Sequence, residues 1–462
     1  MKRIVFLGNS VAGVAAIEEI RKFDQASPIT IISENADLPT QRHLFGSWLA
    51  KEIKEEDVLY RPADYYKANN ITLLFGKNIV RVDFKKNRVI MEDKESIDFD
   101  ILVITDTLTT KFPDIKGIQK KGVFSTRRFN DIKEVNSSLA LIETIVVQVS
   151  DLMGFLLACA LRQRNKEVIL VVPSDFLLSS VIDQGPAQVL TKLLDDNAVR
   201  IITGNSIAEI LGDGDVKAVR LSSGKVLASQ AVIFSQTKAD FKLFVNSGLT
   251  LDAVPRQLTS AERNSQLLRG TSPCFPQNVK KEEARTVLTS SIKLLKESEG
   301  SAPNLEQEIV AGALAIRVNE SFKTNLDHVY AVDEACVFSI DKYLCDFEIS
   351  AGYLAEQGRV VGRSILGEVC SYSVIPRFIS LNIFDTSVVL LGMTKNQSEL
   401  REYKEFDPRQ NMYKKILMEN DLVVGAILIN VKDEGQKIKR LIEEKVTVTP
   451  DEFSEAKFPV NL

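Results

Sequence analysis

The chain has 462 residues, enough for about three domains of ~150 residues. Hydrophobic residues make up 45% and charged residues 26%, which is the balance of an ordinary globular protein and excludes a disordered or fibrous one. The net charge of −4 argues against a protein that coats nucleic acid or a polybasic membrane protein, and two histidines leave little material for a His-rich metal shell.

The cysteines and the apolar segments bear on the compartment. The five cysteines contain no C-x-x-C pair and fit neither a zinc knuckle nor a disulfide framework. We therefore predict a reducing cytoplasm and no metal site. The apolar start 1–16 is broken at Gly8–Ser10, and the apolar region 142–161 contains charged residues, so neither a signal peptide nor a membrane span is predicted.

The first hundred residues have the spacing of a βαβ unit. A short apolar run at 3–7 predicts a strand, the apolar positions from Gly13 onward fall at helical spacing, and Ile29–Ile32 predicts a second buried strand. Glu34 follows that strand, 26 residues after Gly8, which is typical of βαβ connections. Further strands are predicted at 71–75, 81–83, 88–91 and 101–104.

A second unit of the same kind begins near residue 143. It comprises a strand at 145–149, a helix at 154–164 and a strand at 168–172, so the fold repeats although the residues do not. Four strands that we interpret as hairpin-like follow at 199–203, 207–211, 216–221 and 231–234.

The pattern then breaks and later resumes. Residues 253–310 hold four prolines, many polar residues and one helical stretch at 284–295, which we interpret as an inserted arm or linker. Strands at 313–318 and 329–332, a helix at 349–365, and then an alternation of strands with a closing helix over 373–462 are predicted after it, with a hairpin turn at Asn420-Asp421.

This order of elements resembles the FAD- and NAD(P)H-dependent pyridine nucleotide-disulfide oxidoreductase superfamily, in its NADH:acceptor reductase branch of rubredoxin reductase, NADH oxidase and the flavoprotein part of nitrite reductase. The best-matching stretches are 8–13, 56–62, 99–104, 329–332, 356–359 and 424–429. The resemblance implies an α/β fold of two nested Rossmann-like, FAD- and NAD(P)-binding domains plus a small α+β C-terminal domain. Its parts would be an FAD-binding-like domain over 1–112 and 241–372 with the arm 253–310 inserted, an NAD(P)-binding-like domain over 113–240, and a dimerisation-type domain over 373–462.

The resemblance also implies an FAD site. Seven residues match its positions: Gly8, Ser10, Gly13, Glu34, Arg42, Glu334 and Gln357. Several of these depart from the pattern of the family, because Ser10 replaces the second glycine of the phosphate turn and Asp333-Glu334 replaces a Gly-Asp pair. Thr105-Asp106-Thr107 likewise replaces an Ala-Thr-Gly turn, so FAD binding is expected to be handicapped and its presence stays open.

The site that should hold NAD(P)H departs further. Its phosphate loop, 149–154, keeps only the last glycine, Gly154, and Asp151 stands closest to the expected pyrophosphate. Val172 replaces the carboxylate that would bind the ribose. Binding of NAD(P)H is therefore predicted to be lost, and since Cys159 falls on an apolar helix face, no catalytic residue is assigned.

Three hypotheses for function follow. The first is a degenerate family member that serves as a structural or regulatory subunit beside a catalytic partner, in a homo- or hetero-oligomer that could include an active paralogue. The second is an FAD-dependent subunit that passes electrons between a partner protein and an acceptor, and the third is an adenine-nucleotide module without redox chemistry. The low glycine content, 23 of 462, favours the first because glycine is lost where a cofactor would approach.

Overall fold

The structure is a computed structural model of the full chain. It describes residues 1–105, 110–235, 238–239, 242–244, 247–253, 314–338, 351–372, 378–396, 400–431 and 433–448. The packing divides the chain into one unit of residues 1–250 with 316–462 and a second of residues 251–315. Nearly all of the predicted arm 253–310, including its helical stretch, lies outside the described residues.

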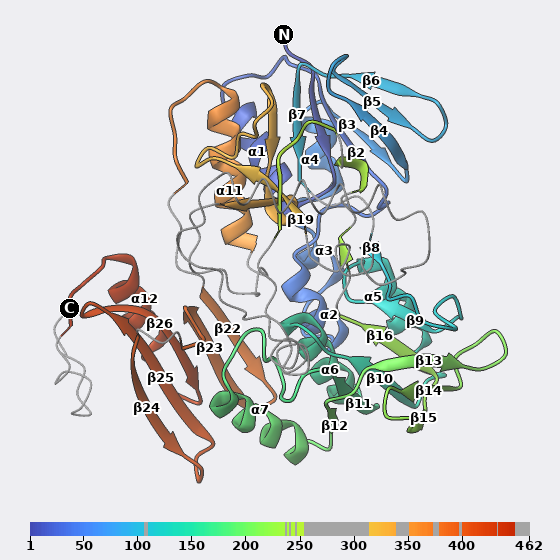
Figure 1. Cartoon of the computed structure of the whole chain (residues 1–462), viewed down its shortest axis with the longest axis vertical. Helices are drawn as coiled ribbons and strands as arrows, with labels where there is room; N and C mark the ends of the chain where they lie inside the picture. Colours follow the sequence, from blue (N-terminus) through green and yellow to red (C-terminus); the bar gives the residue numbers. More distant parts are fainter. Residues whose placement is uncertain are drawn as a thin grey trace, which may run out of the picture. The chain divides into compact units, whose positions relative to one another are not determined.

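The first sheet is parallel and has the strand order β20-β7-β1-β2-β3 (Figure 1). Its strands are β1 (Ile4–Leu7), β2 (Ile29–Ser33), β3 (Ile71–Phe75), β7 (Ile101–Ile104) and β20 (Val329–Ala331). The central strand β1 pairs with both neighbours in the same register, Ile4 opposite Ile29 on one side and Ile101 on the other. Every residue of β1 and β7 is buried, as continuous apolar runs in a parallel sheet require.

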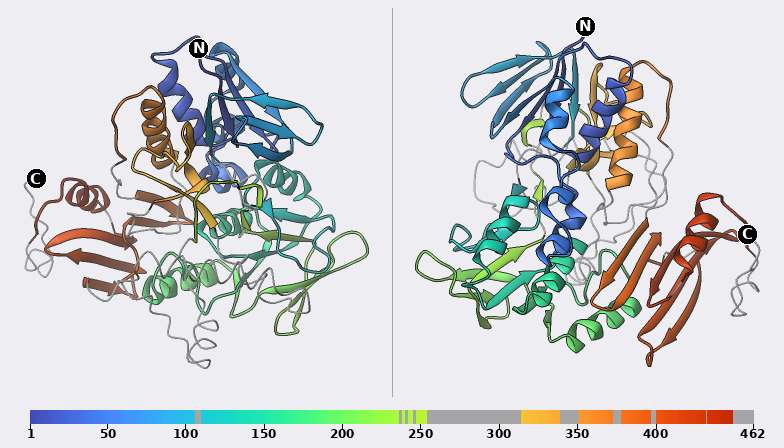
Figure 2. Two further views of the ribbon diagram at one scale, coloured as in Figure 1. Left: turned by 45° about the horizontal axis from the view of Figure 1, so that its top comes forward. Right: turned by 180° about the vertical axis from the view of Figure 1, so that it is seen from behind.

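Two helices, α1 (Val11–Arg21) and α11 (Ala351–Ile365), lie side by side on this sheet (Figures 1 and 2). Their approach depends on glycine, because a Cβ on Gly358 would stand 2.1 Å from the Ala12 carbonyl oxygen. A Cβ on Gly362 would stand 2.6 Å from Glu19 Cβ. The small residues of both helices therefore set how closely the late helix α11 packs on the early helix α1.

The second sheet is also parallel, with the order β12-β11-β10-β16-β9. Its strands are β9 (Val123–Ser125), β10 (Thr144–Gln148), β11 (Glu167–Val172), β12 (Arg200–Thr203) and β16 (Ala231–Phe234), with helices α5 (Phe129–Ser138), α6 (Leu152–Gln163) and α7 (Gln184–Asp196) beside it. The hairpin-like interpretation was wrong for β12 and β16, which pair in parallel with β11 and β10. Because β20 of the first sheet follows all these strands in the chain, one Rossmann-like sheet is nested in the other.

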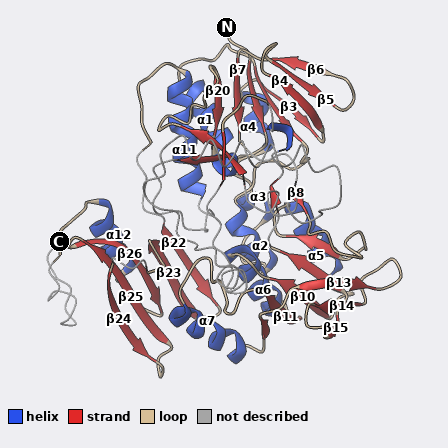
Figure 3. Cartoon of the chain, in the orientation of Figure 1, coloured by secondary structure: helices blue, strands red, loops and turns tan. Residues whose placement is uncertain are grey.

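The C-terminal part is a five-stranded antiparallel sheet of order β22-β23-β26-β25-β24 with one helix (Figure 3). Its elements are β22 (Phe378–Ile383), β23 (Thr386–Gly392), β24 (Arg401–Asp407), β25 (Met412–Glu419), β26 (Leu422–Ile429) and α12 (Gly435–Glu443). The predicted turn between β25 and β26 is present, with Asn420 and Asp421 both at positive φ, 49° and 63°. The predicted fold class, two nested Rossmann-like sheets with a small α+β part, is confirmed.

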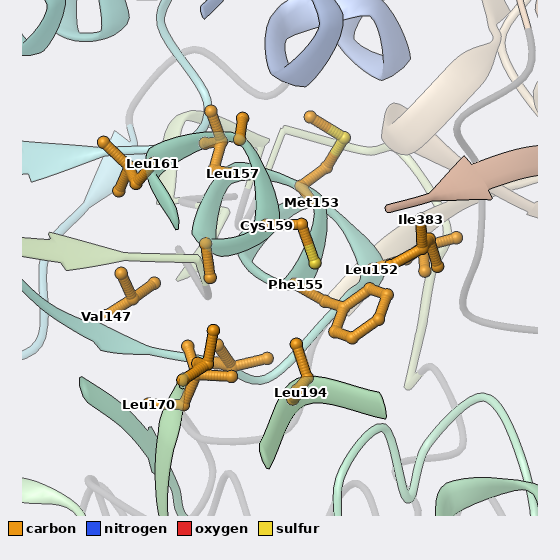
Figure 4. Close-up of a cluster of buried hydrophobic side chains, with 14 of the residues drawn as sticks. Val147, Leu152, Met153, Phe155, Leu157, Cys159, Leu161, Leu170, Leu194 and Ile383 are labelled. Atoms are coloured by element: carbon orange, nitrogen blue, oxygen red, sulfur yellow. The ribbon is translucent and has the colours of Figure 1, made fainter. Parts of the chain in front are cut away.

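The largest apolar core surrounds α6 (Figure 4). Phe155, Leu157 and Cys159 of that helix are buried in one cluster with Val147 of β10 and Ile383 of β22. The second sheet and the C-terminal sheet thus share one hydrophobic core.

Short elements complete the described chain. They are η1 (Arg42–Leu44), α2 (Phe45–Leu49), α3 (Glu55–Val58), α4 (Ala63–Ala68), β4 (Ile79–Asp83), β5 (Arg88–Met91), β6 (Ser96–Asp98), β8 (Thr110–Lys111), β13 (Ile207–Leu211), β14 (Ala218–Leu221), β15 (Val226–Ala228), β17 (Lys238–Ala239), η2 (Lys242–Phe244), β18 (Leu251–Ala253), β19 (Leu314–Val318), η3 (Asp333–Ala335) and β21 (Cys336–Phe338). Within the described ranges, no helix has both the length and the apolarity needed to cross a membrane.

Candidate functional site

The turn between β1 and α1 is built by three of the predicted residues. Gly8 has φ +98°, a conformation that favours glycine, and its N–H donates to the Ile32 carbonyl at 2.8 Å. Ser10 is the N-cap of α1, and its Oγ accepts the Gly13 N–H at 3.1 Å. A Cβ on Gly13 would lie 3.0 Å from Thr105 Cγ2, so this glycine lets the helix pack against the residue that follows β7.

A pocket of ≈ 740 Å³, which includes space open to solvent, lies at this turn. Its lining residues are Asn9, Ser10, Val11, Asn35, Asp37, Leu38, Thr40, Gln41, Arg42, Arg127, Phe129, Asp333, Ala351 and Leu354. The loops after β1, β2 and β20 thus meet over the carboxyl ends of the first sheet, where ligands of such folds bind.

The pocket carries charges of both signs, from Asp37, Arg42, Arg127 and Asp333. Burial raises the pKa of the Asp37 carboxyl, while the Lys133 ammonium at 3.9 Å acts in the opposite direction. Asn9 donates its side-chain N–H to the Asp37 carbonyl. The Oδ1 atom of Asn9 is buried and has no hydrogen-bond partner within the described residues.

The other predicted residues of the FAD site are distributed unequally. Arg42 lines the pocket, whereas Glu34 directly follows β2 and is half-buried outside the lining. Gln357 of α11 is buried, and its Oε1 accepts the Asp333 N–H at 3.2 Å. Glu334 lies in η3 beside Asp333, and its side chain is outside the description.

The turn of the second unit, between β10 and α6, repeats the first with different residues. Asp151 stands where Ser10 stands: it is the N-cap of α6, and its Oδ1 accepts the Gly154 N–H at 2.9 Å. Burial raises the pKa of the Asp151 carboxyl, opposed by the Gly154 N–H, by Arg42 and by Ser235. The N-terminus of α6, where the dipole and free N–H groups would favour an anion, is therefore already capped by the Asp151 side chain.

Two further residues distinguish this second turn. Val149 stands where Gly8 stands and is buried in the core, with its N–H donated to Val171 at 2.9 Å. Gly154 is retained, and a Cβ there would come 2.5 Å from Ser235 Cβ. The one remaining glycine of this turn thus serves the packing of α6 on the sheet, as its sequence position indicated.

The described cysteines, Cys159, Cys336 and Cys370, are all free thiols. Cys159 is buried among apolar side chains, and burial raises its pKa, so it is no thiolate nucleophile (Figure 4). Among the residues that the structure describes, no cluster of three or more His, Cys, Asp or Glu side chains could hold a metal ion.

Sequence reasoning missed Asn9, Asp37 and Arg127 as lining residues of the pocket. Asn9 and Asp37 lie in the loops after β1 and β2, so their place at the carboxyl edge of a parallel sheet was a signal that could have found them. Arg127 lies between β9 and α5, beside the second sheet, and only tertiary packing brings it to the pocket.

Comparison with known protein families agrees with these two turns and the C-terminal sheet. The family of pyridine nucleotide-disulphide oxidoreductases matches residues 2–254. The chain belongs to this family. The C-terminal domain of rubredoxin NAD+ reductases matches residues 378–446, which are β22 to the end of α12 and the residues just after it.

Individual members of the pyridine nucleotide-disulphide oxidoreductase family are distant in sequence. The NAD(P)H nitrite reductase of Bacillus subtilis (strain 168) is 23% identical over 97% of this chain and 48% of its own length. The assimilatory nitrate reductase electron transfer subunit of the same organism is 22% identical over 96% of this chain and 50% of its own length. The chain thus spans about half the length of these relatives.

Solved structures of the family share the fold. The covalent complex of putidaredoxin reductase with putidaredoxin contains a chain with a TM-score of 0.76 and 18% identity, over 99% of this chain and 97% of that one. The NADH:rubredoxin oxidoreductase of Clostridium acetobutylicum has a TM-score of 0.65 and 18% identity, over 96% of this chain and 95% of that one.

Proposed function

We propose that this chain is a family member that does not take hydride from NAD(P)H and acts as a structural or regulatory subunit beside a catalytic partner protein in the cytoplasm. The proposal assigns 1–112 and 241–372 to an FAD-binding-like domain, 113–240 to an NAD(P)-binding-like domain and 373–462 to an oligomerisation domain. The observation that carries it is the Asp151 carboxylate at the N-terminus of α6.

The physical argument concerns the pyrophosphate of NAD(P)H. A dinucleotide places this group at the N-terminus of the helix after the first strand, where backbone N–H groups and the helix dipole stabilise the charge. Asp151 already uses the Gly154 N–H there. A second negative charge ~4 Å from a carboxylate costs about 4 kcal/mol at an effective dielectric constant near 20, roughly a thousandfold in affinity. Binding must therefore overcome this repulsion or protonate Asp151.

The first turn fits a nucleotide pyrophosphate better. Gly8 and Gly13 are kept, the cap Ser10 is uncharged, and Arg42 supplies a cation in the pocket. These residues could hold the adenosine diphosphate half of FAD, a cofactor that when bound supplies electron transfer. This favours a second candidate function, an FAD-containing subunit that exchanges electrons with a partner protein. In support, one relative is an electron transfer subunit of an assimilatory nitrate reductase, and one similar structure is a covalent complex of putidaredoxin reductase with putidaredoxin.

The deciding experiment is a visible spectrum of the purified protein before and after incubation with FAD, followed by anaerobic addition of NADH and then of dithionite. We expect that NADH does not bleach the flavin absorption, either of flavin purified with the protein or of flavin bound after incubation with FAD. Flavin that dithionite bleaches and NADH does not would support the second candidate. Flavin that NADH bleaches rapidly would contradict the proposal.

A pair of reciprocal variants tests the role of the carboxylate itself. Asp151→Ser keeps an N-cap and removes the charge, copying the first turn, while Ser10→Asp does the opposite. Titration calorimetry with NADH should show tighter binding to Asp151→Ser than to the wild-type protein. Equal NADH affinity of both proteins would show that Asp151 does not close this site.

A further inference from the structure

We infer that the pocket at the first turn binds a nucleoside diphosphate such as ADP, and that Asp333 excludes the second half of a dinucleotide from it. The inference rests on the proposed function and names the ligand of its first βαβ unit. It makes Asp333 the residue that determines specificity in a pocket whose lining it shares with Ser10 and Arg42.

The strand order fixes which loops each half of a dinucleotide would cross. β2 and β3 lie on one side of β1, and β7 and β20 lie on the other. A pyrophosphate at the N-terminus of α1 directs the adenosine half toward the end of β2, where a carboxylate binds the ribose in such folds. Glu34 and Asn35 follow β2, so the second half would have to cross the ends of β7 and β20.

The adenosine side of the pocket is equipped for a ligand. Arg42 provides a cation for phosphate oxygens, and Asn35 lines the wall beyond β2.

On the opposite side, Thr105 directly follows β7 and Asp333 lies two residues after β20. Thr105 is completely buried: its hydroxyl donates to the Leu7 carbonyl at 3.2 Å and its methyl packs toward Gly13, so it offers nothing to a ligand. Asp333 lines the pocket and has φ +64°. Glycine adopts this left-handed conformation more readily than aspartate does.

The surrounding structure holds Asp333 in this strained conformation. Its N–H donates to Gln357 Oε1 at 3.2 Å, and the preceding residue, Val332, is fully buried with its N–H donated to Ile104 at 2.9 Å. Because the backbone is fixed on both sides, the Asp333 side chain and its charge stay at the wall that the second half of a dinucleotide would pass.

The test measures binding of ADP and of FAD by equilibrium dialysis, to the wild-type protein and to Asp333→Gly. Wild-type protein should bind ADP, and FAD no more tightly than ADP. Asp333→Gly should bind FAD at least about tenfold more tightly than wild-type protein does while its ADP affinity stays the same. The matched control is Asp421→Gly, which replaces an aspartate at φ 63° in the C-terminal hairpin and should leave both affinities unchanged.

Other results would overturn the inference. The inference is wrong if the wild-type protein is purified with FAD or binds FAD about tenfold more tightly than ADP. It is also wrong if the wild-type protein binds neither ligand, or if Asp333→Gly does not raise the affinity for FAD. A different result, the reduction of bound flavin by NADH, would contradict the proposed function.

Discussion

Lys415 provides the sharpest test of how the second parallel sheet with its helices is joined to the C-terminal sheet. This lysine of β25 has no exposed side-chain surface. Its ammonium contacts the carboxylate of Asp183, the carboxylate of Glu402 at 3.4 Å and the Thr394 carbonyl at 3.0 Å. Asp183 directly precedes α7, so this ion pair connects the C-terminal sheet to a helix beside the second parallel sheet.

The variant Lys415→Met keeps most of the side-chain volume and removes the charge. It removes the ammonium partner of the Asp183 carboxylate, which still accepts the Asn396 N–H at 3.2 Å. Removing one partner of a fully buried ion pair typically costs about 3–5 kcal/mol, because the other charge is left uncompensated. The Asp183 side chain is 31% exposed, so solvent compensates part of its charge and the loss should lie at or below the lower end of that range. Lys404→Met is the matched control: Lys404 contacts the same Glu402 at 2.9 Å but is 54% exposed, so its loss should cost about 0–1 kcal/mol.

Equilibrium urea unfolding followed by far-UV circular dichroism gives the free energy of unfolding of each variant. Neutralising the two carboxylates as well, with Asp183→Asn and Glu402→Gln added to Lys415→Met, should recover most of the loss. The reasoning is refuted if Lys415→Met is no less stable than Lys404→Met.

Two further predictions concern helix ends and helix packing. Burial raises the pKa of the folded Asp151 carboxyl above its unfolded value of about 3.9. The folded state therefore binds the proton of this carboxyl more tightly than the unfolded state does. The stability that this protonation contributes is lost as pH rises through the folded pKa. Asp151→Asn, which keeps an N-cap, should therefore melt at a higher temperature than wild-type protein near pH 8 and at the same temperature below about pH 4; equal melting temperatures at both pH values would contradict this. Gly358→Ala would place a Cβ 2.1 Å from the Ala12 carbonyl and should cost about 1–3 kcal/mol, whereas Gly435→Ala, with its nearest atom at 3.4 Å, should change stability by less than about 1 kcal/mol in urea unfolding.

The strands of the two parallel sheets were predictable because they are local signals. β1, β2, β10 and β11 are runs of buried β-branched and aliphatic residues, and each lies within one residue of its predicted bounds. The pairing of β12 and β16 could not be predicted from local signals, because it is set by partners far away in the chain.

Several elements escaped prediction, and β24 and α7 illustrate two different reasons. β24 is a charged strand at the edge of its sheet, paired on one side only, so it lacks an apolar alternation. α7 begins with Gly185 and Pro186 in its first turn, residues that read as a loop although proline is tolerated there.

The site was predictable where spacing alone defines it. Gly8, Ser10 and Gly13 form the first turn because the strand, turn and helix around them are contiguous. Asp333 was recognised as a replacement for glycine, yet its position in the wall of the same pocket depends on β20 pairing beside β7. The distance of more than 300 residues between this loop and the first turn hid that relation.

Several glycines of the two turns and of α11 are required by packing. At Gly13, Gly154, Gly358 and Gly362 a Cβ would come within 3.0 Å or less of other protein atoms. These positions are thus held by packing and would be needed whether or not a dinucleotide binds. At positions 10 and 151 no such contact forbids a side chain, and each side chain there caps its helix. The apoprotein is therefore expected to be fully folded, so weak binding of NAD(P)H would reflect the chemistry of the turn at Asp151 and not a loss of structure.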